Sequence, residues 1–128
     1  ELFHLTHLQE LYLSDNHIQK VDNQLSQLDN LRYLHLQNNK LKAIPDGLGN
    51  LQNLQTLDLS YNMLKTLPKS ISKLPLLVYL YLQKNLFKDI PQEIYDLTSL
   101  SHLYISDCKI SSISSQIKNL TDLQYLSL

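Results

Sequence analysis

Residues 54–76 read LQTLDLSYNMLKTLPKSISKLPL, and residues 77–99 read LVYLYLQKNLFKDIPQEIYDLTS. Each stretch is 23 residues long, and aligning the two places leucine, isoleucine or phenylalanine at the same seven positions. The unit recurs in both directions, at residues 8–30 and 31–53 before these stretches and at residues 100–122 after them. Partial units occupy residues 1–7 and 123–128, so an internal repeat spans all 128 residues.

The seven repeated positions are apolar in every unit, 40 residues in all. In the unit at 54–76 they are Leu54, Leu57, Leu59, Leu64, Leu67, Ile71 and Leu74. Leu57 and Leu59 alternate with polar residues, which predicts a short strand with both leucines on one face. The later spacing of three or four residues predicts a turn or two of helix. One unit cannot bury its apolar face alone, so we expect the units to stack around one continuous core.

The spacing L-x-x-L-x-L-x-x-N-x-L-x-x-L-P-x-x-I-x-x-L resembles the leucine-rich repeat family along the whole chain. The resemblance implies an α/β solenoid, with a curved parallel β-sheet on the concave side and short helical or irregular segments on the convex side. Residues 1–128 then form a single domain. Because the chain begins and ends inside a repeat and shows no polar capping repeat, we expect it to be a fragment of a longer protein.

Composition excludes several classes of partner. With 11 basic and 12 acidic residues the net charge is -1, so we expect no nucleic-acid partner. The longest apolar run, residues 74–82, contains Pro75 and is far shorter than a bilayer span, so we expect no membrane partner. Glycine-rich phosphate loops are missing from the sequence, and we expect no cofactor and no small-molecule substrate. A single cysteine favours a reducing compartment.

An asparagine follows the strand in four of the units. A buried amide without partners is costly, so the column predicts satisfied hydrogen bonds, and the family resemblance implies a ladder in which each amide bonds the neighbouring turn. Cys108 takes this place in the fifth unit and is interpreted as an unreactive packing residue rather than a catalytic thiol. The asparagines are Asn16, Asn39, Asn62 and Asn85.

A proline follows the fifth apolar position in three units and marks the exit to the convex side. Asp22 and Ser114 replace it in the first and last units. With only two glycines in the chain, we expect these positions, rather than glycine, to turn the chain. The prolines are Pro45, Pro68 and Pro91.

We call the outward-facing strand positions, equivalent to Thr56, Asp58, Ser60 and Tyr61 of the third unit, the concave face. These 22 positions hold seven of the eight tyrosines, whereas uniform placement would put about 1.4 there. Tyrosine favours strands, but threonine, valine and isoleucine share that preference and contribute only Thr56. Tyrosine is also enriched where proteins bind one another, which favours selection for contact. We expect the centre of the patch in the third to fifth units, around Tyr61, Tyr79, Tyr81 and Tyr104.

The candidate partner-binding residues all lie on this face. Four acidic residues, Glu10, Asp15, Asp58 and Asp107, lie on this face with one lysine, Lys84. This excess of negative charge favours a partner with exposed arginine or lysine. A stripe at Lys42, Lys65 and Lys88 on the loop side is interpreted as a solvated surface. The candidates are Tyr12, Tyr33, His35, Asp58, Tyr61, Tyr79, Tyr81, Lys84, His102, Tyr104, Asp107 and Tyr125.

Only one arrangement could suggest catalysis: His35, Asp58 and Ser60, a possible base, orienting group and nucleophile on neighbouring strands. An open sheet supplies neither an oxyanion hole nor a closed pocket, so we expect no enzyme activity, and a hydrogen-bonded His35–Asp58 pair instead. The same two residues are too few ligands for a metal ion.

The sequence therefore predicts a protein-binding module. The 23-residue unit resembles both intracellular repeat proteins associated with small GTPases and effectors of bacteria that live inside host cells. This resemblance implies a cytoplasmic location, or secretion into a host cytosol, and an effector that inhibits or sequesters an enzyme. The alternative is a substrate-recruiting arm of an enzyme whose catalytic domain lies outside this chain.

Overall fold

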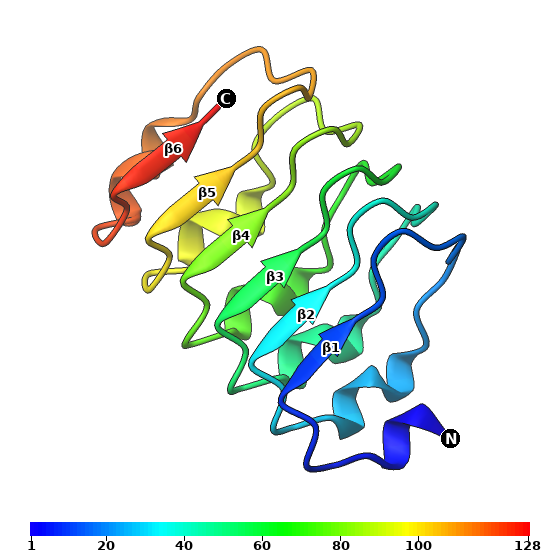
Figure 1. Cartoon of the computed structure of the whole chain (residues 1–128). Coiled ribbons are helices and arrows are strands. Elements are labelled where there is room, and N and C mark those ends of the chain that lie inside the picture. The colour runs from blue at the N-terminus through cyan, green and yellow to red at the C-terminus, as the bar shows by residue number, and fades with distance from the viewer.

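Six short strands lie side by side in chain order and form one parallel sheet (Figure 1). The computed structural model describes all 128 residues. Each strand pairs with its neighbour at a shift of one repeat, so Leu34, Leu57 and Leu80 face each other across the sheet. The strands are β1 (Glu10–Tyr12), β2 (Tyr33–His35), β3 (Thr56–Asp58), β4 (Tyr79–Tyr81), β5 (His102–Tyr104) and β6 (Tyr125–Ser127).

Short 3-10 helices line the side opposite the strands, and the two termini lie at opposite ends of the row (Figure 1). The predicted solenoid, with a parallel sheet on one side and short helical segments on the other, is confirmed. Ile71 and Leu74 are three residues apart, the period at which 3-10 side chains eclipse. The helices are η1 (Leu2–His4), η2 (Asn23–Gln27), η3 (Asp46–Asn50), η4 (Lys69–Lys73), η5 (Gln92–Asp96) and η6 (Ser115–Asn119).

Each of η2 to η6 begins directly after the proline position of its repeat. Pro45, Pro68 and Pro91 precede η3, η4 and η5, and their fixed φ suits this place because no backbone donor is needed there. Where proline is missing, a side chain caps the helix: Asp22 accepts a hydrogen bond from Gln24 N at 2.8 Å, and Ser114 Oγ accepts one from Gln116 N at 3.2 Å.

The core is one cluster of 29 buried apolar residues that runs through all the interior repeats. The expected continuous core does not cover the apolar columns at the two ends, where Leu5, Ile113 and Leu128 are 54%, 48% and 50% exposed. Each repeat buries its apolar side chains against the repeats before and after it, and these residues have a neighbour on one side only.

The two glycines occupy positions of close contact rather than turns. Both lie in η3, and neither has a positive φ. A Cβ atom on Gly47 would lie 2.5 Å from the carbonyl oxygen of Asn23, and one on Gly49 would overlap the backbone of Ser70. Glycine therefore lets η3 pack closely between η2 and η4, a role that the repeat pattern did not predict.

The asparagine ladder forms as expected at three of its four positions. The expectation is wrong for Asn16, which is exposed and donates only within its own turn, to the carbonyl oxygens of Leu13 and Ser14, because no complete repeat precedes it. Asn62 Nδ2 donates to the carbonyl oxygens of Leu36 at 3.0 Å and Leu59 at 3.1 Å, and its Oδ1 accepts from Leu41 N at 3.0 Å. Asn39 and Asn85 make equivalent bonds. The ladder joins each repeat to the one before it and fixes the turn that ends each strand.

Cys108 continues the ladder with a weaker bond. Its Sγ lies 3.6 Å from the carbonyl oxygen of Leu82, whereas the amide of Asn85 reaches its cross-repeat carbonyl at 2.9 Å and also accepts from Leu64 N. Partial burial raises the pKa of the Cys108 thiol, which disfavours the reactive thiolate.

Replacing Cys108 with asparagine is expected to raise the free energy of unfolding by about 1 kcal/mol, because the amide can both donate and accept. Urea denaturation monitored by circular dichroism measures this. Cys108→Ala is the control that adds no hydrogen bond. A Cys108→Asn variant no more stable than Cys108→Ala would contradict the prediction.

Candidate protein-binding face

The strand register arranges the concave face as two rows of side chains that run across the sheet. Residues one repeat apart are direct cross-strand partners, so each row takes one side chain from every strand. The first row is Tyr12, His35, Asp58, Tyr81, Tyr104 and Ser127; the second is Glu10, Tyr33, Thr56, Tyr79, His102 and Tyr125.

Five rings on β4, β5 and β6 form a connected group that we call the aromatic cluster. The ring centroids of Tyr81 and Tyr104 are 4.6 Å apart with planes 9° from parallel, and Tyr104 lies 4.7 Å from Tyr125. Tyr79 lies 4.7 Å from His102, which lies 5.9 Å from Tyr125. Stacking of this kind holds the rings in defined positions before any partner binds.

All twelve candidate residues are at least partly exposed to solvent. The aromatic cluster differs from the expected centre, because it includes His102 and Tyr125, whereas Tyr61 contacts Lys84 instead. The remaining tyrosine, Tyr95, is buried in η5, where burial raises its pKa. The repeat register alone could have indicated that His102 adjoins Tyr79 on one side and Tyr125 on the other.

The turn after each of β1 to β5 places a non-glycine residue in the left-handed region. The φ angles of Tyr61, Lys84 and Asp107 are 53°, 54° and 55°. Aspartate and asparagine tolerate this conformation, but for other side chains it costs about 1–2 kcal/mol. Lys84 Nζ lies 5.1 Å from the centroid of the Tyr61 ring, a cation–π contact that offsets part of this cost.

The Asp58 carboxylate is oriented by Ser60, in the turn that follows β3. Its Oδ1 accepts hydrogen bonds from Ser60 N at 3.0 Å and from Ser60 Oγ at 2.6 Å. Ser60 is only 2% exposed, so its expected place on the exposed face is wrong. The predicted His35–Asp58 hydrogen bond does not form, because His35 stacks on Tyr12, with ring centroids 4.6 Å apart and planes 11° from parallel.

Two other acidic groups of this face, Glu10 and Asp15, have partners within it. Glu10 accepts a hydrogen bond from the Tyr12 hydroxyl at 3.1 Å, which raises the pKa of Tyr12. Asp15 Oδ1 accepts from Asn38 Nδ2 at 2.6 Å. Asp58 and Tyr81 are direct cross-strand partners. The pKa of Tyr81 is raised first by partial burial and then by Tyr104, Asp58 and Tyr79.

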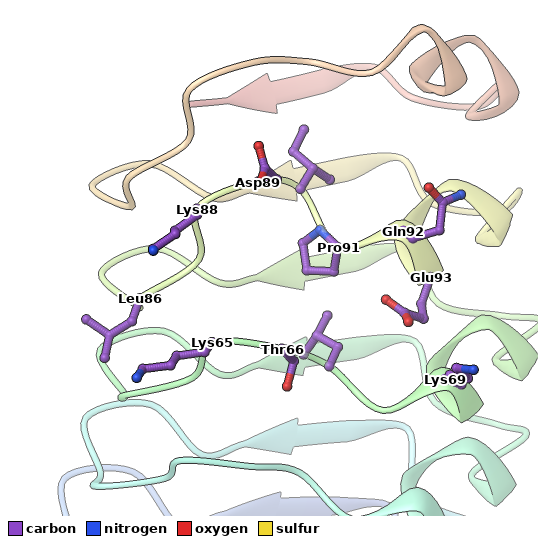
Figure 2. Close-up of a pocket in the computed structure, with 11 residues that line it drawn as sticks. Lys65, Thr66, Lys69, Leu86, Lys88, Asp89, Pro91, Gln92 and Glu93 are labelled. Carbon is purple, nitrogen blue, oxygen red and sulfur yellow. The ribbon is translucent and has the colours of Figure 1, made fainter.

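A hollow on the loop side is chemically mixed. Figure 2 shows Lys65, Lys88 and Leu86 at one end and Lys69, Gln92 and Glu93 at the other. Most of its lining side chains are exposed, which agrees with a solvated surface. No three side chains of histidine, cysteine, aspartate or glutamate lie together where they could bind a metal ion. None of the helices has the length and hydropathy needed to cross a bilayer.

Parallel strands in 23-residue register, 3-10 helices opposite them and an asparagine ladder between coils define a solenoid of the leucine-rich repeat class. The sequence profile of a family described as "Leucine-rich repeat region" matches residues 1–128. The chain therefore belongs to the leucine-rich repeat family, and the resemblance read from its repeat pattern is confirmed.

Several solved structures are similar to this chain. The leucine-rich repeat protein LIC12759 of Leptospira interrogans is 35% identical and has a TM-score of 0.97, with 99% of this chain and 32% of that protein covered. The internalin InlF of Listeria monocytogenes is 30% identical and has a TM-score of 0.85, with 97% of this chain and 35% of that protein covered. Among curated proteins, no relative matches the sequence.

A plant receptor is also similar. The ectodomain of the Arabidopsis thaliana receptor kinase GASSHO1/SCHENGEN3, solved in complex with CASPARIAN STRIP INTEGRITY FACTOR 2, is 34% identical with a TM-score of 0.86, covering 97% of this chain and 16% of its own. This chain thus spans about a third or less of the length of each of these proteins.

Proposed function

We propose that this chain binds a protein partner through its concave face, with the aromatic cluster at the centre of the contact. The observation that carries the proposal is the set of five neighbouring rings, joined by two stacked and two tilted pairs and all at least partly exposed. Pre-ordered aromatic side chains lose little conformational entropy on binding and present a large contact area.

Two further observations support the binding of a protein partner. Tyr61 and Lys84 occupy left-handed turn positions where asparagine would cost less, and a binding role for their side chains would offset this backbone cost. A similar solved structure is described as a plant peptide hormone receptor, RGFR1, in complex with RGF2. An enzyme-inhibiting effector and a substrate-recruiting arm both require the binding step proposed here.

Tyr104 is the ring to test first, because it lies between Tyr81 and Tyr125 in the cluster. Tyr104→Ala is expected to weaken the complex by about 2 kcal/mol, roughly 30-fold in Kd, as truncation of a central hot-spot tyrosine does. The immobilised protein would first be used to isolate a partner, and calorimetry with the purified partner would then give Kd.

Leu76→Ala is the matched control, since Leu76 is 46% exposed and lies outside the concave face. It is expected to leave Kd within about twofold of the original value. Circular dichroism would verify that both variants keep the fold. A partner that binds Tyr104→Ala as tightly as the unsubstituted protein would show that this face is not the interface.

A further inference from the structure

The first row of the concave face is aromatic on both sides of a single carboxylate. Tyr12 and His35 precede Asp58, and Tyr81 and Tyr104 follow it, each pair stacked nearly parallel. Asp58 is the direct cross-strand partner of His35 on one side and of Tyr81 on the other. The row is therefore a stack of rings with one position left open, and a carboxylate stands at that position.

The opening is wide enough to admit one flat group. His35 and Tyr81 lie on strands two spacings apart, about 9.6 Å for parallel strands. A planar group in contact with a ring on each face needs about 7–8 Å between those rings. One face of His35 is covered by Tyr12 and one face of Tyr81 by Tyr104, so the faces turned toward Asp58 are the ones left uncovered by these stacks.

The carboxylate is held in place. Both hydrogen bonds from Ser60 reach Oδ1 of Asp58, which orients the group and leaves Oδ2 for another donor. The basic side chain of this face, Lys84, is engaged with Tyr61 instead. A partly buried carboxylate between aromatic faces, without a cation of its own, is complementary to a flat cation.

We propose that His35, Tyr81 and Asp58 form a slot for the guanidinium group of an arginine side chain on the partner. The rings stack on the two faces of the guanidinium, and Asp58 accepts its N–H groups. This inference deepens the proposed function, on which it rests, because the arginine belongs to the protein bound on the concave face. Arginine fits better than lysine because a guanidinium is planar and stacks, whereas an ammonium does neither.

The slot can be tested without the natural partner. The probes are N-acetyl-arginine amide, N-acetyl-lysine amide and N-acetyl-citrulline amide, titrated into the full chain while ¹H–¹³C NMR follows the rings of His35 and Tyr81. We expect the arginine probe to bind with a Kd on the order of 1 mM, as a small ligand of this size can. The lysine probe should bind at least about fivefold more weakly, and the neutral, nearly isosteric citrulline probe more weakly still.

The variants separate the slot from the general charge of the face. Asp58→Asn keeps an oxygen for Ser60 and is expected to weaken the arginine probe at least about tenfold. Asp107→Asn removes the same charge at a turn position that suits asparagine. This variant should change the affinity for the arginine probe less than about twofold. Tyr81→Phe keeps the ring and should bind normally, whereas Tyr81→Leu should bind about fivefold more weakly.

Equal binding of the arginine and lysine probes, equal loss in Asp58→Asn and Asp107→Asn, or unshifted His35 and Tyr81 resonances would each overturn the slot. The partner assay separates this result from failure of the proposed function. If Tyr104→Ala loses the partner while Asp58→Asn changes neither probe nor partner binding, the face binds but the slot is wrong. If the probe enters the slot while Tyr104→Ala still binds the partner, the guanidinium site stands and the proposed interface fails.

Discussion

Replacing Asn62 with leucine is expected to lower the free energy of unfolding by about 4 kcal/mol, because the change removes hydrogen bonds on both sides of the amide. The N–H of Leu41 loses its acceptor, Oδ1 of Asn62, at a buried place where water cannot substitute. The carbonyl oxygens of Leu36 and Leu59 lose one donor each but keep the amides of Asn39 and Asn85. Urea denaturation gives the change in free energy directly.

Asn50→Leu makes the same chemical change at an exposed position at the end of η3 and is expected to stay within about 0.5 kcal/mol of the original stability. Asn62 is buried in the turn after β3 and is not part of the concave face. The folded Asn62→Leu protein should therefore still bind the partner. An Asn62→Leu variant as stable as Asn50→Leu would mean that the ladder does not hold the coils together.

The fold could be predicted almost completely because the repeat specifies it many times over. One-residue alternation at Leu57 and Leu59 gives the strand, and the 23-residue shift gives its register. The 3-10 character of the convex side was also present in the spacing of Ile71 and Leu74, although a helical turn of either kind fits three- or four-residue spacing. The contacts of Gly47 and Gly49 could not be predicted, because they depend on how closely neighbouring coils approach.

The candidate face was predictable by position but not by contact. The 23-residue repeat predicts that Asp58 lies between His35 and Tyr81 in the sheet. It does not show which neighbouring group each side chain contacts. Asp58 accepts a hydrogen bond from Ser60, two residues further along the chain, and the ring of His35 stacks on Tyr12. These choices depend on side-chain rotamers and on local bonds that short polar residues make to nearby groups. The open position in the aromatic row follows from those choices.

Replacing Leu57 with alanine is expected to lower the free energy of unfolding by about 4 kcal/mol. Leu57 is 0% exposed and lies in β3, where Leu34 and Leu80 face it from the strands on either side. The truncation removes apolar contact and leaves a cavity that two neighbouring coils must share, since each coil is held mainly by the coils before and after it. Thermal and urea unfolding both measure the loss.

Leu76→Ala controls for the chemistry of the change, because Leu76 is 46% exposed, and a cost below about 0.5 kcal/mol is expected there. Nearest-neighbour stabilisation of the solenoid predicts a second effect of Leu57→Ala. Weakening both interfaces of the central coil should let the two halves of the chain unfold separately, and the urea m-value should fall. Hydrogen exchange would locate the break at β3, between His35 and Tyr81. An unchanged m-value with uniform loss of protection would show that coupling extends beyond adjacent coils.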